Sequence, residues 1–255
     1  MSHNTTVPPS TNHTEVVIQV KGLTTKFGRQ VVHDHLNLNI YRNEVLSLVG
    51  ASGAGKSILF HCLIQLRHLQ SGTITYAPAY QNTNAILFQT GGLISSLTVL
   101  ENVMLPLLET EKKSYKEAFR ISKAILLRLN IVEQDFQKFP SNISGGMVKR
   151  VGIARALVTN PKIIFLDEPT SGLDPISAQE FDDLILDIKQ EFGLTCVIVS
   201  HDLQSIFNLS DRVAVIVDKK IIEGTLEEII QNPHPWIQAY FNGPRGRQIR
   251  GYYGS

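Results

Sequence analysis

In the first part of the chain, apolar residues fall into short blocks that polar residues separate. Blocks at 16–20, 36–40 and 45–49 alternate or run continuously, and the third leads directly into a glycine-rich turn. Blocks at 72–76 and 85–88 have the same character. Short runs rich in Val, Ile and Leu with polar boundaries are typical of β-strands. The beginning of the chain is therefore predicted to form strands.

Between 98 and about 160 the spacing of the apolar positions changes from that of a strand to that of a helix. Residues spaced by three or four positions share one face of a helix. Here the shared face is formed by Tyr115, Ala118, Phe119, Ser122, Ile125, Leu126 and Leu129. The middle of the chain is therefore predicted to be a helical insertion.

The pattern of the last third returns to strands that alternate with helices. Blocks at 163–166 and 195–199 flank a helical stretch at 174–192, an alternation typical of a parallel sheet. Asp218 and Lys219 form a predicted tight turn between blocks at 213–217 and 221–222, and a break follows at Asn232-Pro233. The prediction is an α/β core that helices interrupt once.

Composition favours one globular domain without a strong charge of its own. Hydrophobic residues make up 43% of the 255 positions, and 24 Lys and Arg stand against 23 Asp and Glu, so we expect no nucleic-acid partner. No apolar run approaches the ~20 residues that cross a bilayer. Residues 1–15 lack the features of a secretory signal, and we expect a disordered tail. Cys62 and Cys196 are expected to be small core residues.

The segment GASGAGKS at 50–57 follows a predicted strand and opens a predicted helix at 56–67, as a phosphate-binding loop does. Glycines let backbone N–H groups turn toward phosphates, and the helix N-terminus favours negative charge. Lys56 is then expected to reach the β and γ phosphates, and Ser57 to hold Mg²⁺. The alternative is a structural glycine-rich turn. The candidate nucleotide-binding residues are Gly50, Ser52, Gly53, Ala54, Gly55, Lys56 and Ser57.

The segment IIFLDE at 163–168 is an apolar strand that ends in two carboxylates. Because successive strand side chains point to opposite faces, Asp167 and Glu168 are expected to have different roles. Asp167 suits the Mg²⁺ shell, and Glu168 suits a base that orients the attacking water. The alternative is a solvated end of a strand.

Further motifs resemble those of the ABC ATPase family, in the order and spacing of that family. ISGGM at 143–147 resembles the family signature, in which Ser144, Gly145 and Gly146 open a second helix. Phe27 resembles the aromatic residue that stacks on adenine. The remaining marks are Gln89 of the Q-loop, Asp174 of the D-loop and the switch histidine His201. The resemblance covers about residues 16–231.

This resemblance implies a fold, an activity and cofactors. The fold is α/β, a P-loop NTPase core of ABC type at 16–232 with an antiparallel β subdomain and a helical subdomain at about 90–158. A C-terminal extension follows at 233–255. The activity is hydrolysis of ATP with Mg²⁺, in a sandwich of two copies whose signatures close on each other's nucleotide. Glu168, His201 and Gln89 would be catalytic, and Ser57, Gln89 and Asp167 would serve the metal.

A narrower resemblance is to the ATPases of Mla-type phospholipid transport systems. It rests on Met147 in place of the usual signature Gln, on FQTGGL at 88–93 and on NGP at 242–244. It implies transport between the two membranes of a Gram-negative envelope and a position on the cytoplasmic face of the inner membrane. The implied partners are a permease, an MCE-domain lipid-binding protein and a small STAS-type subunit. Ile143 for the usual Leu is a conservative change, whereas Met147 removes an amide.

Other functions remain possible at this point. One is the ATPase of another ABC system, of the amino-acid, lipoprotein or cell-division type. Another is a non-transport ABC ATPase, although the chain has neither a long coiled-coil insertion nor two fused ATPase halves. A GTPase would carry an NKxD motif, which is absent.

Two segments outside the motifs have candidate contact roles. Leu93 and Leu97 follow two glycines, in the region that receives a helix of the permease in the family, and the alternative is that they serve the core. In the tail, Trp236, Tyr240 and Phe241 share a helix face ahead of a basic segment at 245–250. We expect this tail either to lie near the interface between two copies or to pack on its own subunit.

Overall fold

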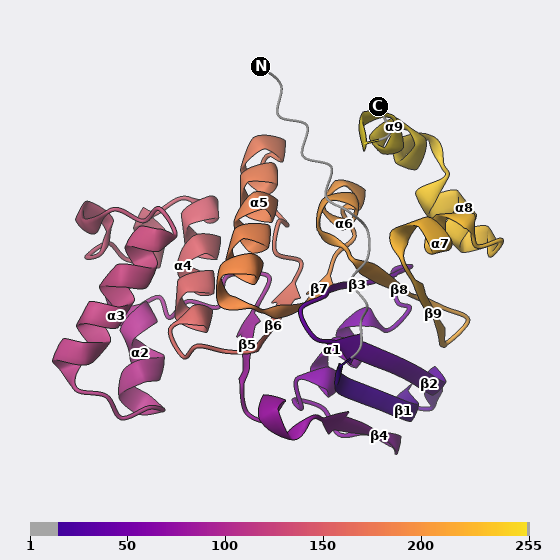
Figure 1. Ribbon diagram of the computed structural model, residues 1–255, viewed down its shortest axis with the longest axis horizontal. Coiled ribbons are helices and arrows are strands. Elements are labelled where there is room, and N and C mark those ends of the chain that lie inside the picture. The colour runs from indigo at the N-terminus through magenta and orange to yellow at the C-terminus, as the bar shows by residue number, and fades with distance from the viewer. Residues whose placement is uncertain (1–14, 254–255) are drawn as a thin grey trace.

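The computed structural model describes residues 15–253, whose strands form two sheets (Figure 1). The tail expected at 1–15 lies outside the described residues apart from Glu15, whose carbonyl accepts a hydrogen bond from the Arg42 N–H at 2.9 Å. The strands are β1 (Val16–Phe27), β2 (Gln30–Tyr41), β3 (Val45–Gly50), β4 (Ser71–Tyr76), β5 (Asn84–Leu87), β6 (Ile163–Asp167), β7 (Thr195–Val199), β8 (Arg212–Val217) and β9 (Lys220–Gly224).

The larger sheet has the strand order β5-β6-β7-β3-β8-β9, and its first five strands are parallel. Only β9 is antiparallel, because the tight turn at 218–219 returns it beside β8. Val199 of β7 pairs with Leu48 of β3 on one side and with Asp167 of β6 on the other. The carboxyl ends of β3, β6 and β7 therefore meet at one edge, where ligands of parallel α/β sheets usually bind.

The helices agree with the sequence analysis at 174–192 and within the insertion at 98–160, whereas those at 203–209, 226–231 and 244–253 were not predicted. In chain order, the helices are α1 (Lys56–Leu63), α2 (Val99–Glu109), α3 (Tyr115–Arg128), α4 (Gly145–Leu157), α5 (Pro175–Phe192), α6 (Leu203–Leu209), α7 (Leu226–Gln231), α8 (Pro235–Phe241) and α9 (Pro244–Tyr253). The expected extension of α1 to Arg67 is wrong, because Gln65 takes a left-handed φ of 61° that ends the helix. The last helix, α9, was not predicted from the sequence pattern. Within 15–253, no helix is long and apolar enough to cross a bilayer.

Capping residues explain why the helices of the middle segment begin where they do. Thr98 and Ser114 form capping boxes with Glu101 and Glu117 at the starts of α2 and α3. Ser144 caps α4 through a hydrogen bond from the Met147 N–H. This capping starts α4 at Gly145, within the signature segment.

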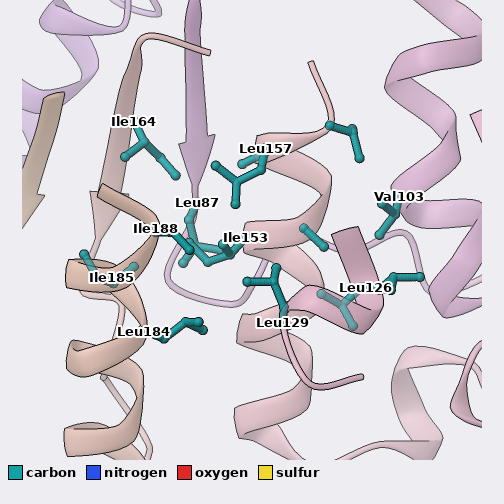
Figure 2. Packing of buried hydrophobic residues seen from close by; sticks show 14 of the residues in the cluster. Leu87, Val103, Leu126, Leu129, Ile153, Leu157, Ile164, Leu184, Ile185 and Ile188 are labelled. Carbon is teal, nitrogen blue, oxygen red and sulfur yellow. The ribbon is translucent and has the colours of Figure 1, made fainter. Parts of the chain in front are cut away.

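The largest core joins the helical segment to the parallel sheet. Figure 2 shows Val103 of α2 and Leu126 of α3 on one side of Ile153 and Leu157 of α4. On the other side of α4 lie residues of β5, β6 and α5, among them Leu87, Ile164, Leu184, Ile185 and Ile188. Because α4 packs against α2 and α3 on one side and against the sheet on the other, it fixes the position of the helical segment relative to the sheet.

The second sheet is antiparallel, with the order β2-β1-β4, and it covers α1 and the other face of the large sheet. Phe60 of α1 packs edge-to-face on Phe165 of β6 at 5.8 Å between ring centroids. Cys62 and Cys196 are both buried, as expected. The α/β class with an antiparallel portion and a helical insertion is thus confirmed.

Candidate functional site

Four loops with candidate residues extend from one edge of the large sheet. They are 51–55 after β3, 88–92 after β5, 168–174 after β6 and 200–202 after β7. Parallel strands place these loops side by side, although up to 150 residues separate them in the chain. The parallel order is therefore what collects the separate motifs at one site.

The loop at 51–55 has the backbone of a phosphate-binding cradle. Gly55 has a φ of 101°, and a Cβ at this position would come within 2.4 Å of the His33 Nε2 and 2.5 Å of the Val32 Cγ1. Only glycine fits, both sterically and in its φ. The Lys56 ammonium donates to the carbonyls of Gly50 at 2.7 Å and Ala51 at 3.1 Å. Burial lowers the pKa of Lys56.

The other residues of this loop and of the start of α1 divide into exposed and partly buried positions. Ser52, Gly53 and Ser57 are exposed, whereas Ala54 packs against the core under the antiparallel sheet. The start of α1 thus presents backbone N–H groups, an ammonium and a hydroxyl to the same space. This donor set fits the phosphates of a nucleotide, and the oxygen donors Ser57 and Asp167 are of the kind that Mg²⁺ prefers.

His33 of β2 supports this loop from beneath, and the sequence motifs did not reveal it. Its side chain is fully buried, and its Nδ1 is 2.8 Å from the Thr25 hydroxyl. Burial lowers the pKa of His33 from 6.5 to about 4, so the ring is neutral at pH 7. The His33 ring lies so close to Gly55 that an added Cβ would clash with it, and only the tertiary structure shows this contact.

Glu168, Gln89 and His201 form a connected polar cluster. The Gln89 amide donates to one carboxylate oxygen of Glu168 at 2.9 Å and to the Ser171 hydroxyl at 3.2 Å. The His201 Nδ1 lies 3.0 Å from the other oxygen of Glu168. The structure therefore brings together the three residues that the sequence analysis selected as catalytic, with Glu168 at the centre.

The two carboxylates at the end of β6 do take different positions, but for a different reason than the expected alternation. The strand ends at Asp167, and Glu168 has a left-handed φ of 45°. Its N–H still donates to the Val199 carbonyl at 2.8 Å, so the turn is held while the side chain is redirected toward Gln89. Burial, followed by the charge of Glu168, raises the pKa of Asp167. An unusual φ in a bulky residue is a feature that often marks a functional site.

Helix α4 donates hydrogen bonds to the turn that carries Gln89, and the sequence analysis did not predict this contact. Lys149 is 5% exposed, and its ammonium donates to the carbonyls of Gln89 and, at 3.3 Å, of Glu168. One and two turns further along, Gly152 lies against Gly91 and the Arg155 guanidinium donates to the Gly92 carbonyl. The helix that Ser144 caps is therefore tied directly to the polar cluster.

The signature residues begin this same helix. Ser144 and Gly145 are exposed, and the Ser144 hydroxyl caps the helix by accepting from the Met147 N–H at 3.3 Å. Met147 is partly buried against the core that joins the helices to the sheet. Helices α1 and α4 lie apart in the molecule (Figure 1). The two helix starts thus form separate exposed surfaces.

Asp174 and Phe27, two further candidate residues, lie at the start of α5 and at the end of β1. The Asp174 carboxylate caps α5, accepting from the N–H groups of Ile176 and Ser177 at 3.0 Å and from the Ser177 hydroxyl at 2.6 Å. The Ser177 hydroxyl bond lowers the pKa of Asp174. The side chain of Phe27 lies outside the described part of the chain, so its contact with adenine stays a prediction.

A hollow of about 840 Å³ borders the polar cluster. One wall is formed by Glu168, Ser171 and His201, and the other by residues of α8 and α9, among them Tyr240, Arg245 and Gln248. The C-terminal helices, which the sequence analysis placed in a separate extension, therefore lie close to the site.

Comparisons with known proteins agree with this geometry. Residues 33–171 match the family model described as ABC transporter. The chain is 35% identical over 245 residues to the probable ribonucleotide transport ATP-binding protein mkl of Mycobacterium leprae, covering 90% of this chain and 70% of that protein. It is 36% identical over 224 residues to the methionine import ATP-binding protein MetN of Haemophilus influenzae, covering 82% of this chain and 64% of that protein.

Two solved structures share the fold. CbiO1 of Clostridium perfringens, part of an ABC transporter complex, has a TM-score of 0.77 with 27% identity and covers 93% of this chain and 100% of its own. The ATP-binding cassette MJ0796, solved as a dimer bound to ADP and Pi, has a TM-score of 0.71 with 29% identity, covering 82% and 98%.

Proposed function

Because this chain belongs to the ABC transporter family, as an ATP-binding subunit that hydrolyses ATP with Mg²⁺, we propose that it powers transport of phospholipids between the inner and outer membranes of a Gram-negative envelope. The observation that carries the lipid assignment is the combined resemblance of Met147, FQTGGL and NGP to Mla-type ATPases. A second candidate is import of a small polar solute, favoured by the identity to proteins named for ribonucleotide and methionine transport.

The close packing of the FQTGGL turn at 88–93 against α4 supports its use in this assignment. Gly91 and Gly92 have φ values of 78° and 62°, and Cβ atoms there would press on Val148 at 2.7 Å and Arg155 at 2.9 Å. The turn is therefore shaped by close contact with α4. Leu93 next to it packs against the core, whereas Ile94 is 40% exposed. An exposed apolar side chain at the end of a tightly held turn suits a contact with a permease.

In this proposal each residue of the cluster has one task in hydrolysis. Glu168 accepts the proton of the attacking water, and Gln89 and His201 hold its carboxylate in place through the contacts at 2.9 Å and 3.0 Å. Lys56 exchanges its two carbonyl partners for phosphate oxygens. Ser57 and Asp167 would provide oxygen donors for Mg²⁺, which would supply positive charge next to the phosphates.

Assembly follows from the exposure of the signature. Because Ser144 and Gly145 are exposed and α4 lies apart from α1, the signature of one copy would meet the nucleotide of a second copy. We propose a homodimer bound to a permease at the cytoplasmic face of the inner membrane, with an MCE-domain protein and a STAS-type subunit as further partners. Lys149 would then carry the movement of the signature helix to Gln89 and Glu168.

The lipid assignment is tested with the purified complex of this chain and its permease in vesicles that contain a fluorescent phospholipid. ATP should drive phospholipid transfer, and Glu168→Gln should abolish transfer while ATP binding persists, because an amide cannot accept the proton. Parallel vesicles loaded with methionine or ribonucleotides serve as the control. ATP-driven movement of one of these solutes without lipid transfer would replace the phospholipid assignment by the second candidate.

A further inference from the structure

The main chain of the switch histidine is held by a residue of the C-terminal segment. His201 lies between the end of β7 and Asp202, which caps α6 by accepting from the Gln204 N–H at 3.1 Å. The Tyr240 hydroxyl of α8 donates to the His201 carbonyl at 2.9 Å. The side chain of His201 is 65% exposed, so packing alone does not fix the turn that carries it.

Tyr240 itself is firmly placed. Its ring stacks on Trp236 with 4.8 Å between centroids and 14° between planes, and it meets Phe241 edge-on at 5.0 Å. Phe241 and Ile237 are fully buried in a core that includes Ile206 of α6 and residues of β3 and β8. Helix α8 is thus anchored to the large sheet and to the helix that follows the switch.

The chemistry of the hydroxyl suits a permanent donor. Burial, followed by the negative charge of Asp202, raises the pKa of Tyr240, so the phenol stays protonated at neutral pH. A carbonyl in a turn accepts such a bond without a change of its own state. The bond therefore persists through the pH range in which an ATPase works.

We propose that Tyr240 is a positioning residue for ATP hydrolysis: its hydroxyl fixes the main chain of His201, which keeps the imidazole facing Glu168. The Nδ1 of that imidazole lies 3.0 Å from the Glu168 carboxylate, so a small rotation of the turn would break the contact. The Tyr240 hydroxyl in this way acts, through His201, on the site of its own subunit. The inference rests on the roles proposed above for Glu168 and His201.

The test is Tyr240→Phe in the full chain, which removes the hydroxyl and keeps the ring. Steady-state ATPase measurements should show kcat reduced about three- to tenfold, the effect of one lost neutral hydrogen bond, with an unchanged KM for ATP. Lys56 and the loop at 51–55 are not touched by the change, which is why KM should hold. Emission of Trp236, the only tryptophan of the chain, reports whether α8 stays packed.

Two matched controls separate positioning from packing. Tyr76→Phe removes a tyrosine hydroxyl that donates to the Leu63 carbonyl away from the switch, and should lower stability but not kcat. Trp236→Phe changes the packing of α8 but keeps an aromatic ring for Tyr240 to stack on and keeps the Tyr240 hydroxyl, so kcat should stay near the parent value. Equal losses of kcat in Trp236→Phe and Tyr240→Phe would overturn the inference, because packing would then explain both.

Failure of the inference is distinguishable from failure of the proposed catalytic roles. Glu168→Gln and His201→Ala are measured beside Tyr240→Phe. If both of these retain parental kcat, the proposed roles are wrong and the inference falls with them. If both lose activity while Tyr240→Phe retains parental kcat, the inference alone is wrong.

Discussion

Acidification should destabilise the protein through His33, and the size of the effect follows from its burial. The folded-state pKa of His33 is about 4, compared with 6.5 for the exposed ring. Between these values the unfolded chain binds a proton that the folded protein excludes, so stability falls as the pH falls. The contribution of neutral His33 to the free energy of unfolding is fully present above pH 6.5, the pKa of the exposed ring. At ~1.4 kcal/mol per pKa unit, the loss is about 2 kcal/mol between pH 7 and pH 5.

The measurement compares the parent protein with His33→Gln, whose amide can still bond the Thr25 hydroxyl but does not titrate. Urea unfolding is followed by Trp236 emission at pH 7 and at pH 5. The change in stability is compared between the two proteins because buried Glu44 has the opposite effect on stability as the pH falls. Burial raises its pKa from 4.5 to about 7, so its protonation favours the folded state as the pH falls. This contribution is common to both proteins and cancels.

The expected result is that the parent loses about 2 kcal/mol more than His33→Gln between the two pH values. His33→Leu serves as a second variant if the glutamine disturbs the loop at 51–55. Equal pH dependence of parent and variants would refute the reasoning, since it would mean that the ring is already solvated or already charged in the folded protein.

Four other perturbations have definite expected outcomes. Lys56→Ala should weaken ATP binding at least ~10-fold in calorimetric titration, because a charge paired to the phosphates is lost; unchanged affinity would argue against 50–57 as the site. Gly152→Ala should lower the free energy of unfolding by about 1–3 kcal/mol despite better helix propensity, since the new Cβ would lie 2.5 Å from the Leu87 side chain and 2.8 Å from the Gly91 carbonyl. Gly251→Ala, whose Cβ meets nothing within 4 Å, is the control, and equal melting of both variants would contradict the overpacking. Leu93→Glu should lower the melting temperature of the isolated subunit, whereas Ile94→Glu should leave it unchanged and reduce stimulation of the ATPase by the permease; the reverse pattern would exchange their assignments. Deletion of 243–255 should weaken self-association in analytical ultracentrifugation while basal ATPase persists, and equal association of both chains would remove the tail from the interface.

Much of the fold and site could be predicted from the sequence, because local patterns encode them. The strand at 195–199 matches the expectation residue for residue, and α3 lies within the helical insertion expected at 98–160, since hydrophobic blocks act over a few positions. GASGAGKS, Gln89, Glu168 and His201 were found from motif order, and ATP hydrolysis with Mg²⁺ is confirmed by the comparisons. Roles of the single site residues stay predictions.

Contacts between distant segments were decided only by the tertiary structure. Lys149 binds carbonyls 60 and 19 positions away, His33 lies under a loop 22 positions away, and Tyr240 reaches back 39 positions to His201. None of these side chains belongs to a motif that sequence spacing can reveal. The left-handed turn at Glu168 was equally hidden, because a glutamate is not a residue that favours positive φ. Sequence determined which chemical groups are present and in which elements, since propensity and periodicity are local. The structure decided which groups meet, since that depends on how the parallel strands bring their loops to one edge.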